Sequence, residues 1–243
     1  MTAAEAEGRG SDETARRKFY GRRHGKRLKP LAQALIETRL PLLRVPGAAR
    51  EGEPGRGPVD PAALYPDGRP LWLEIGFGGG EHLAHQAAIH PAVGFIGCEP
   101  FINGVGSLLT RLEAAGLGNV RVHPGDARDL LELLPAASLA RVFLLYPDPW
   151  PKTRHRERRF MNAENLGLLA RAMAPGAVLR LATDIPDYVA HALAAVAASP
   201  DFAVAPGEGA PWARPWADWP GTRYEAKALR EGRRPHYLTF VRG

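Results

Sequence analysis

The sequence predicts an α/β protein with a Rossmann-like, mostly parallel seven-stranded sheet, helices on both faces and an antiparallel closing pair. Two observations predict this fold. From residue 71 onwards, short β-prone apolar segments alternate with longer segments of helical periodicity. The first of these strands is followed by Gly76-Phe77-Gly78-Gly79-Gly80, and acidic residues follow later strands. In a parallel sheet such positions meet at the carboxyl edge, where ligands bind.

The expected elements run in regular order through the chain. Strands are expected at 71–75, 93–98, 120–123, 139–145 and 178–182, and helices at about 81–89, 101–115, 127–134, 157–173 and 186–198. Residues 202–204 and 237–241 are expected to form two closing strands. Because no long helix separates these two strands, we expect them to pair antiparallel. Together the elements form one domain, residues 71–243.

The first seventy residues are expected to divide into two parts. Residues 1–30 form a flexible basic arm, because eight lysines and arginines lie between positions 16 and 29, with Phe19 and Tyr20 among them. Such an arm can hold phosphates and stack on bases, or it can simply keep the chain soluble. Residues 31–70 are expected to contain a short helix at 31–40 and then a covering segment rich in proline and glycine.

Composition narrows the classes of partner. The net charge of +6 favours an acidic partner. Cys98 is the only cysteine, which excludes an internal disulfide and a cysteine-built zinc site, and His82 with His85 lacks a third ligand, so no metal is expected. No apolar run approaches the roughly 20 residues that span a bilayer, and the amino terminus lacks the apolar core of a signal peptide. We therefore expect a cytoplasmic protein with no membrane partner.

The densest chemistry lies between residues 142 and 160. An apolar strand is followed by Pro147-Asp148-Pro149-Trp150-Pro151, whose prolines stiffen the loop. A cationic run follows directly: Arg154, His155, Arg156, Arg158 and Arg159. Runs of this kind are also common on solvated helix faces. A carboxylate on a stiff loop beside an aromatic ring and a cationic run nevertheless suggests that a phosphate-bearing substrate is delivered to an acid.

Four acidic residues are expected near the carboxyl ends of neighbouring strands: Glu74, Glu99, Asp126 and Asp148. The spacing of Glu99 from the glycines is typical of an acid that accepts hydrogen bonds from ribose hydroxyls. Asp126 can accept from an adenine amino group or cap a helix. Glu74 lies in an apolar strand, where a charge needs a partner, and a cationic ligand would supply one.

The position of Glu81 argues against a dinucleotide. It stands where the dinucleotide-binding fingerprint has its third glycine, and its carboxylate would repel a pyrophosphate. A ligand without phosphate is therefore favoured. S-adenosylmethionine fits this description, since it combines an amino acid, a ribose, a base and a sulfonium charge.

Four motifs in this order resemble those of the bacterial tRNA (guanine-N7)-methyltransferases. They are Glu74-Ile75-Gly76-Phe77-Gly78-Gly79-Gly80, Pro147-Asp148-Pro149-Trp150 with Lys152 and Arg154-His155, Ala182-Thr183-Asp184, and Thr222-Arg223-Tyr224-Glu225. The resemblance covers about residues 16–243. It implies a class I methyltransferase fold, S-adenosylmethionine as methyl donor, and a guanosine in the variable loop of tRNA as acceptor.

Carried over by position, the resemblance implies roles for individual residues. The residues implied at the cofactor are Glu74, Gly76, Gly78, Glu99, Asp126 and Asp148, with Asp148 also as the active-site acid. Those implied at the substrate are Lys152, Asp184, Thr222, Arg223, Tyr224 and Glu225, and those on RNA are Arg154, His155, Arg156, Arg158 and Arg159. The sequence departs from the family pattern at Pro151 and after Glu225, so either Lys227 or Arg230 is expected to supply a further substrate contact.

Two other functions stay open at this point. A methyltransferase for another RNA or a small acceptor is the first, although enzymes acting on exocyclic amines tend to carry an Asn/Asp-Pro-Pro-aromatic motif that residues 147–150 do not match. A non-catalytic RNA-binding module is the second, and it predicts damaged cofactor acids, whereas all four are present. Trp212, Trp216 and Trp219 can stack on bases or pack as a lid. A monomer and a homodimer are both compatible with the sequence.

Overall fold

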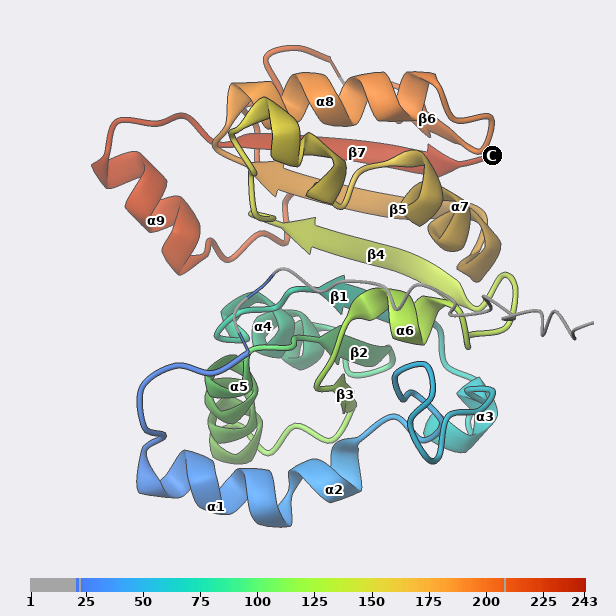
Figure 1. Ribbon diagram of the computed structural model, residues 1–243, viewed down its shortest axis with the longest axis vertical. Helices are drawn as coiled ribbons and strands as arrows, with labels where there is room; N and C mark the ends of the chain where they lie inside the picture. Colours follow the sequence, from blue (N-terminus) through green and yellow to red (C-terminus); the bar gives the residue numbers. More distant parts are fainter. Residues whose placement is uncertain (1–20, 22, 208) are drawn as a thin grey trace, which may run out of the picture.

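The computed structural model describes residues 21, 23–207 and 209–243, and its architecture confirms the predicted α/β fold (Figure 1). One seven-stranded sheet has the strand order β3-β2-β1-β4-β5-β7-β6. The strands are β1 (Leu71–Ile75), β2 (Gly94–Cys98), β3 (Val120–His123), β4 (Leu139–Leu145), β5 (Met173–Thr183), β6 (Phe202–Val204) and β7 (His236–Arg242). Strands β1 to β5 pair in parallel, and β7 runs antiparallel to both β5 and β6, as expected for a closing pair.

Helices cover both faces of the sheet because alternate strand residues point to opposite sides. In β1, Leu71 and Leu73 contribute to one buried apolar cluster and Trp72 to the other. The first cluster is covered by α6 (Ala127–Leu131), α7 (Ala163–Ala172) and α8 (Pro186–Ala197). The second is covered by α1 (Pro30–Thr38), α4 (Glu81–Ile89) and α5 (Ile102–Ala114). The sheet is thus buried on both faces, and ligands have access only at its edges.

The helix expected at 157–173 is wrong in its first part. Residues Thr153–Arg158 form a short 3₁₀ helix, η1, and α7 begins only at Ala163. The side chain of Asn162 caps α7 by accepting a hydrogen bond from the Asn165 backbone at 2.9 Å. The cationic run therefore lies on a separate tight turn. Strand β5 is also longer than expected, since it begins at Met173, which pairs with Leu139.

The region before the sheet folds against its outer strand. The helix expected at 31–40 appears as α1 followed by α2 (Leu40–Leu43), and a short helix α3 (Pro61–Leu64) interrupts the proline- and glycine-rich segment. The Val45 backbone donates to the carbonyl of Val122 in β3 at 3.2 Å. Most of the basic arm expected at 1–30 lies outside the described residues. Within the described part of the chain, no helix is long and apolar enough to cross a membrane.

Strand direction defines the edge that can carry a site. In Figure 1 the arrowheads of β4 and β5 point to the left of the view, which is the carboxyl edge of the parallel strands. The last helix, α9 (Arg223–Arg230), lies at this same left side. The sequence analysis did not foresee α9, because eight residues make only about two turns, which is too short for a periodic pattern to stand out.

Candidate active site

The glycine loop, residues 76–80, connects β1 to α4 at the carboxyl edge. Gly80 has φ of 76°, and a Cβ atom there would lie 2.6 Å from a Leu108 methyl group, so only glycine allows α5 to pack this closely. Gly76 is different. It also has a positive φ, of 70°, but an added Cβ would meet nothing within 4 Å. The space beside the end of β1 is therefore open to a ligand.

Glu99 connects the glycine loop to the end of β2. Its carboxylate accepts hydrogen bonds from the backbone of Gly78 at 2.8 Å and of Phe101 at 2.9 Å. Burial raises the pKa of Glu99, and the two backbone donors oppose that rise. A carboxylate has further lone pairs beyond these two bonds, so Glu99 can still accept from a ligand hydroxyl. The structure thus places Glu99 beside Gly78, and its predicted contact with ribose hydroxyls stays a prediction.

Asp126 lies at the start of α6, where it caps the helix. Its side chain accepts from the Arg128 backbone at 3.0 Å, which confirms the helix-cap alternative. The Arg128 guanidinium also contacts both carboxylate oxygens at 3.0 Å. A contact from Asp126 to an adenine amino group stays a prediction.

Glu74 finds its partner inside the protein. The side chain is only 2% exposed, and its carboxylate accepts a 2.6 Å hydrogen bond from Nδ1 of His82 in α4. The His82 ring packs edge-on against Phe143, with ring centroids 4.7 Å apart. Glu74 therefore has a hydrogen-bond partner in the same chain that the sequence analysis did not identify, and its contact with a cofactor stays a prediction.

The acid loop, residues 146–151, follows β4 and is strained at both ends. Tyr146 has φ of 50° and Trp150 has φ of 41°, a region that costs a non-glycine residue about 1–3 kcal/mol. Asp148 lies between them and is exposed. Its negative charge is among the causes that raise the pKa of Glu99, after burial. Asp148 and Glu99 therefore both lie near the carboxyl ends of the parallel strands, Asp148 after β4 and Glu99 after β2.

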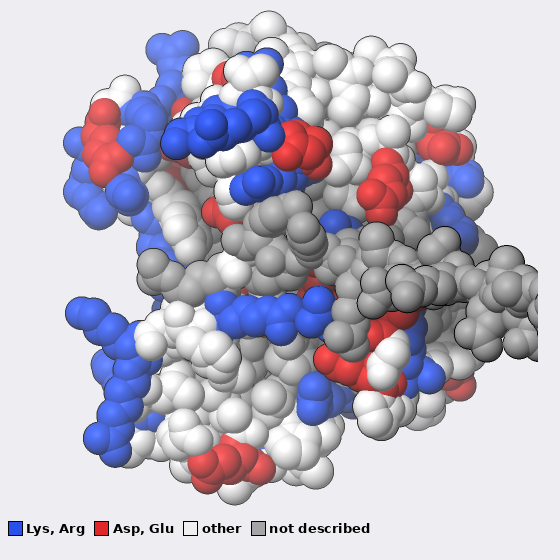
Figure 2. Space-filling model, in the orientation of Figure 1, with Lys and Arg blue, Asp and Glu red and all other residues white. Residues whose placement is uncertain are grey.

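Most of the cationic run lies on the surface beside the acid loop. Arg154 and Arg156 are exposed, while Arg158 stacks on the Trp150 ring at 5.1 Å and His155 meets the same ring edge-on at 5.8 Å. Figure 2 shows lysines and arginines gathered on the left of the molecule, above and below its middle. The described end of the basic arm joins them, because the Arg23 carbonyl accepts from the Ile102 backbone at 3.0 Å.

Arg159 does not belong to this surface. It is 1% exposed, and it donates to the Pro149 carbonyl at 2.8 Å and to the side chain of Asp187. The expectation that Arg159 contacts RNA is therefore corrected, because the guanidinium points into the protein. In a run made almost entirely of cationic residues, the sequence does not indicate which arginine is buried.

Helix α9 brings two of the predicted substrate residues over the glycine loop. A Cβ on Gly78 would lie 3.1 Å from the Arg223 guanidinium and 3.3 Å from the Tyr224 ring. The Tyr224 ring also stacks on Tyr146 of the acid loop, with centroids 6.3 Å apart and planes 21° apart. Lys152 is exposed just after the acid loop. Residues from three distant parts of the chain therefore meet at one place.

Thr222 and Glu225 hold α9 in position. The Thr222 hydroxyl accepts from the Glu225 backbone at 3.1 Å, and the Glu225 carboxylate accepts from the Thr222 backbone at 3.3 Å. The Glu225 carboxylate also accepts from Trp219 Nε1 at 2.9 Å and from the Tyr237 hydroxyl. Trp219 in turn packs edge-on against Trp216 with centroids 5.5 Å apart, which favours the packed-lid alternative for these tryptophans.

Asp184, at the end of β5, has an arginine partner that the sequence analysis missed. Its carboxylate accepts from Arg233 Nε at 2.5 Å. Lys227, one of the two cations considered, instead lies 3.9 Å from Glu231 on its own helix. Arg233 follows a glycine just after α9, in a basic stretch where no spacing distinguishes it from Arg230 or Arg234.

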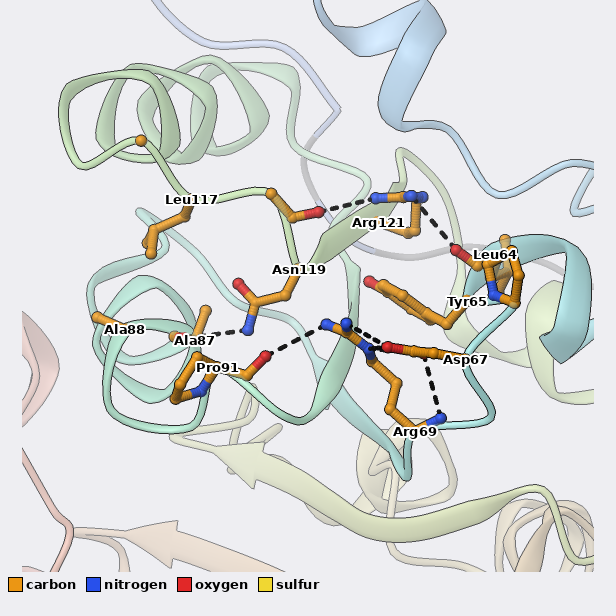
Figure 3. Close-up of a pocket in the computed structure, with 13 residues that line it drawn as sticks. Leu64, Tyr65, Asp67, Arg69, Ala87, Ala88, Pro91, Leu117, Asn119 and Arg121 are labelled. Atoms are coloured by element: carbon orange, nitrogen blue, oxygen red, sulfur yellow. Dashed lines mark hydrogen bonds and ion pairs between the residues drawn. The ribbon is translucent and has the colours of Figure 1, made fainter.

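One cavity in the described part of the chain lies away from this site. It has a volume of about 620 Å³ and opens at the amino ends of β1 to β3, the opposite edge of the sheet. Figure 3 shows why it holds no free charge: Arg69 is bonded to Asp67 and the Pro91 carbonyl, and Arg121 to the carbonyls of Leu64 and Gly118. In the described residues, no group of three or more potential ligands could hold a metal ion.

Comparison with known proteins gives consistent relatives. A family model described as a putative methyltransferase matches residues 68–238. A tRNA (guanine-N(7)-)-methyltransferase of Paracoccus denitrificans is 56% identical over 227 residues, which are 93% of this chain and 95% of that protein. Its counterpart in Cereibacter sphaeroides is 55% identical, over 96% of this chain and 94% of that protein. Another, from Mesorhizobium japonicum, is 49% identical over 92% of this chain and 94% of that protein.

Solved structures agree on the fold. The 16S rRNA methyltransferase KamB superimposes with a TM-score of 0.53 at 15% identity, over 82% of this chain and 98% of that chain. A variant of the 16S rRNA (adenine(1408)-N(1))-methyltransferase from Catenulisporales acidiphilia gives a TM-score of 0.50 at 17% identity, over 76% of this chain and 91% of that chain. At such identities the similarity concerns the fold alone, which is the one expected.

Proposed function

Because the chain belongs to the tRNA (guanine-N7)-methyltransferase family, we propose that it transfers a methyl group from S-adenosylmethionine to N7 of a guanosine in the variable loop of tRNA. The observation that carries the proposal is the meeting of the glycine loop, the acid loop and a cationic surface at one edge of the sheet. The Tyr224 ring of α9 stacks on Tyr146 of the acid loop and lies against Gly78 of the glycine loop, which supports a shared binding region.

The residues at this edge fit S-adenosylmethionine. Open space beside Gly76 leaves room for a ligand against the end of β1, and Glu99 and Asp126 offer acceptors suited to ribose hydroxyls and an adenine amino group. When bound, this cofactor supplies an electrophilic methyl group. Glu74 stays in the proposed cofactor set as a residue that shapes the strand end through His82.

Guanine N7 carries a lone pair and no proton, so the acceptor needs no base to prepare it. The protein must instead align the ring and tolerate the positive charge that forms on it. Carboxylates suit both tasks, because guanine N1–H and the exocyclic amine are donors. We assign this role to Asp148, with Asp184 beside it, and Glu225 acts through its hold on α9.

The cationic surface is proposed to bind the tRNA backbone. Arg154 and Arg156 are exposed next to Asp148, with Lys152, His155 and Arg158 around them. Contacts to phosphate set position and affinity, whereas contacts to the base choose the nucleoside. The exposed Tyr224 ring beside Tyr146 offers a surface on which a base can stack.

The proposal is tested by Asp148→Ala. We expect methylation of unmodified tRNA to fall by about 100-fold to 1,000-fold, as for loss of a transition-state contact. We expect binding of tRNA to stay nearly unchanged, because Asp148 contributes no cation. Labelled methyl transfer followed by nucleoside analysis measures the first quantity, and filter binding measures the second.

The control for this experiment is Asp67→Asn, an exposed carboxylate at the opposite edge of the sheet. It should leave both quantities as in the unaltered protein. Equal losses of binding and methylation in Asp148→Ala would contradict the assignment of Asp148. A methylated nucleoside other than 7-methylguanosine would contradict the proposed acceptor.

A further inference from the structure

Arg159 uses every nitrogen of its guanidinium inside the protein. Nε donates to the Pro149 carbonyl at 2.8 Å, Nη1 to the Asp187 carbonyl at 3.3 Å, and Nη2 to the Asp187 carboxylate. The side chain is 0% exposed and lies over the ring of Tyr188, 5.4 Å from its centroid. A planar fork with several donors suits such an arrangement, whereas a lysine presents its protons from one atom.

These contacts join two strand ends across the site. Pro149 belongs to the acid loop after β4, and Asp187 lies in the first turn of α8, just after β5. The acid loop needs such support, because the residues two before and two after Asp148 both have left-handed backbone angles. A loop held in that geometry relaxes when its support is removed.

Arg156 binds the same carboxylate, that of Asp187, from the solvent side. Its guanidinium donates to the other oxygen of Asp187 at 2.8 Å, and its side chain is 46% exposed. The bond from Arg159, with the nearby charges of both arginines, lowers the pKa of Asp187, so the residue stays ionised at neutral pH. One carboxylate therefore binds a buried arginine that faces the acid loop and an exposed arginine that faces solvent.

We propose that Arg159 is a positioning residue, which fixes the acid loop and thereby the place of Asp148, while its neighbour Arg156 serves tRNA binding. The inference rests on the proposed function of Asp148. It separates two arginines of one cationic run into different roles: Arg159 acts on turnover and Arg156 on affinity. Asp187 links the two.

Steady-state kinetics separate these roles. Arg159→Lys keeps the charge but cannot reach all three acceptors, and we expect kcat to fall about 10-fold to 100-fold, because a shift of about 1 Å in a reacting group can cost about 100-fold. KM for tRNA and Kd for S-adenosylmethionine should stay within about twofold. Arg156→Gln should do the reverse, raising KM for tRNA while kcat stays within about twofold.

Two further measurements exclude a general loss of structure. Methylguanidinium added to Arg159→Ala should restore part of kcat. Arg171→Ala supplies the matched control, because Arg171 also binds backbone carbonyls, those of Leu134 and Leu131, far from the site. It should lose stability without losing kcat, and methylguanidinium should not affect its turnover.

Hydrogen exchange gives a readout that does not need activity. The Tyr146 amide, which donates to the Ala182 carbonyl at 2.7 Å, should exchange faster in Arg159→Lys than in the unaltered protein or in Arg171→Ala. The proposal would be overturned if Arg159→Lys left this exchange unchanged, left kcat unchanged, or raised only KM for tRNA. Failure of the unaltered protein to methylate tRNA would instead contradict the proposed function, and the exchange result would still decide the role of Arg159.

Discussion

At the scale of single residues, the clearest feature is the buried pair of Glu74 and His82. An ionisable residue in the middle of an apolar strand suggests a ligand contact when only the sequence is known. The structure gives a different reason for its presence, because both side chains are at most 3% exposed and bond to each other. Sequence reasoning identified the need for a partner but not which partner, since His82 lies eight residues away on another element.

The pair makes a prediction about stability. Glu74→Gln leaves His82 without its anionic acceptor, and we expect the free energy of unfolding to fall by about 1–3 kcal/mol, as when a buried polar group loses its partner. Urea unfolding at neutral pH measures this change. Glu37→Gln, on the exposed face of α1, is the control and should change stability by less than about 0.5 kcal/mol. Additive effects of Glu74→Gln and His82→Gln in the double variant would argue against the pairing.

At the scale of elements, helix α9 is held by one carboxylate. Glu225 closes the capping box with Thr222 and accepts from Trp219 and Tyr237. These contacts are internal, so the substrate role expected for Glu225 is best served indirectly, through the place of Arg223 and Tyr224. Patterns of apolar residues foretold the strands and most helices, because burial repeats along each element. Helix α9 was not foretold, since it spans only eight residues and the capping box of Thr222 and Glu225 is its main local signal.

Replacing Glu225 tests this role. In Glu225→Ala the Thr222 cap keeps its bond from the backbone of residue 225, but the bonds from the Thr222 backbone, Trp219 and Tyr237 to the carboxylate are lost, which costs about 1–3 kcal/mol. Exchange of backbone amides in residues 222–231 should accelerate about 5-fold to 30-fold, the factor that corresponds to about 1–2 kcal/mol. Hydrogen exchange read by mass spectrometry checks this, with Lys227→Ala, an exposed position on the same helix, as control. Equal acceleration in both variants would show that Glu225 does not anchor α9.

At the scale of the whole molecule, charge is distributed unevenly between the two edges of the sheet. The net charge is +6, and Arg154 and Arg156 project beside the carboxyl edge. The arginines at the opposite edge are more fully engaged, since Arg69 is bonded to Asp67 and the Pro91 carbonyl and is 26% exposed, whereas Arg156 is bonded to Asp187 alone and is 46% exposed. Composition predicted an acidic partner, but only the folded chain distinguishes exposed arginines from those that are engaged internally. Arg159 and Arg233 show this limit, since both lie in basic stretches and both bind carboxylates.

Salt dependence of tRNA binding measures this asymmetry. Replacing Arg154 and Arg156 together by glutamine should weaken binding and reduce the slope of log K against log salt by up to about 2, or about 1 for each lost phosphate contact. Arg69→Gln should leave the slope as it is. Filter binding across a series of salt concentrations provides the data. An equal reduction in all variants would mean that the whole surface, and not the carboxyl edge, attracts the tRNA.

The reversed direction of β7 has a consequence for how the chain completes its centre. If the last strand ran parallel to β5, it would begin at the amino edge of the sheet. The residues that precede it would then also lie at that edge. Because β7 instead begins opposite Thr183, the carboxyl end of β5, the segment that precedes it is delivered to the reacting edge. Residues near the chain's terminus thus stand beside those that follow β1 and β4. The carboxyl edge is therefore completed by the segment that leads into the last strand of the sheet.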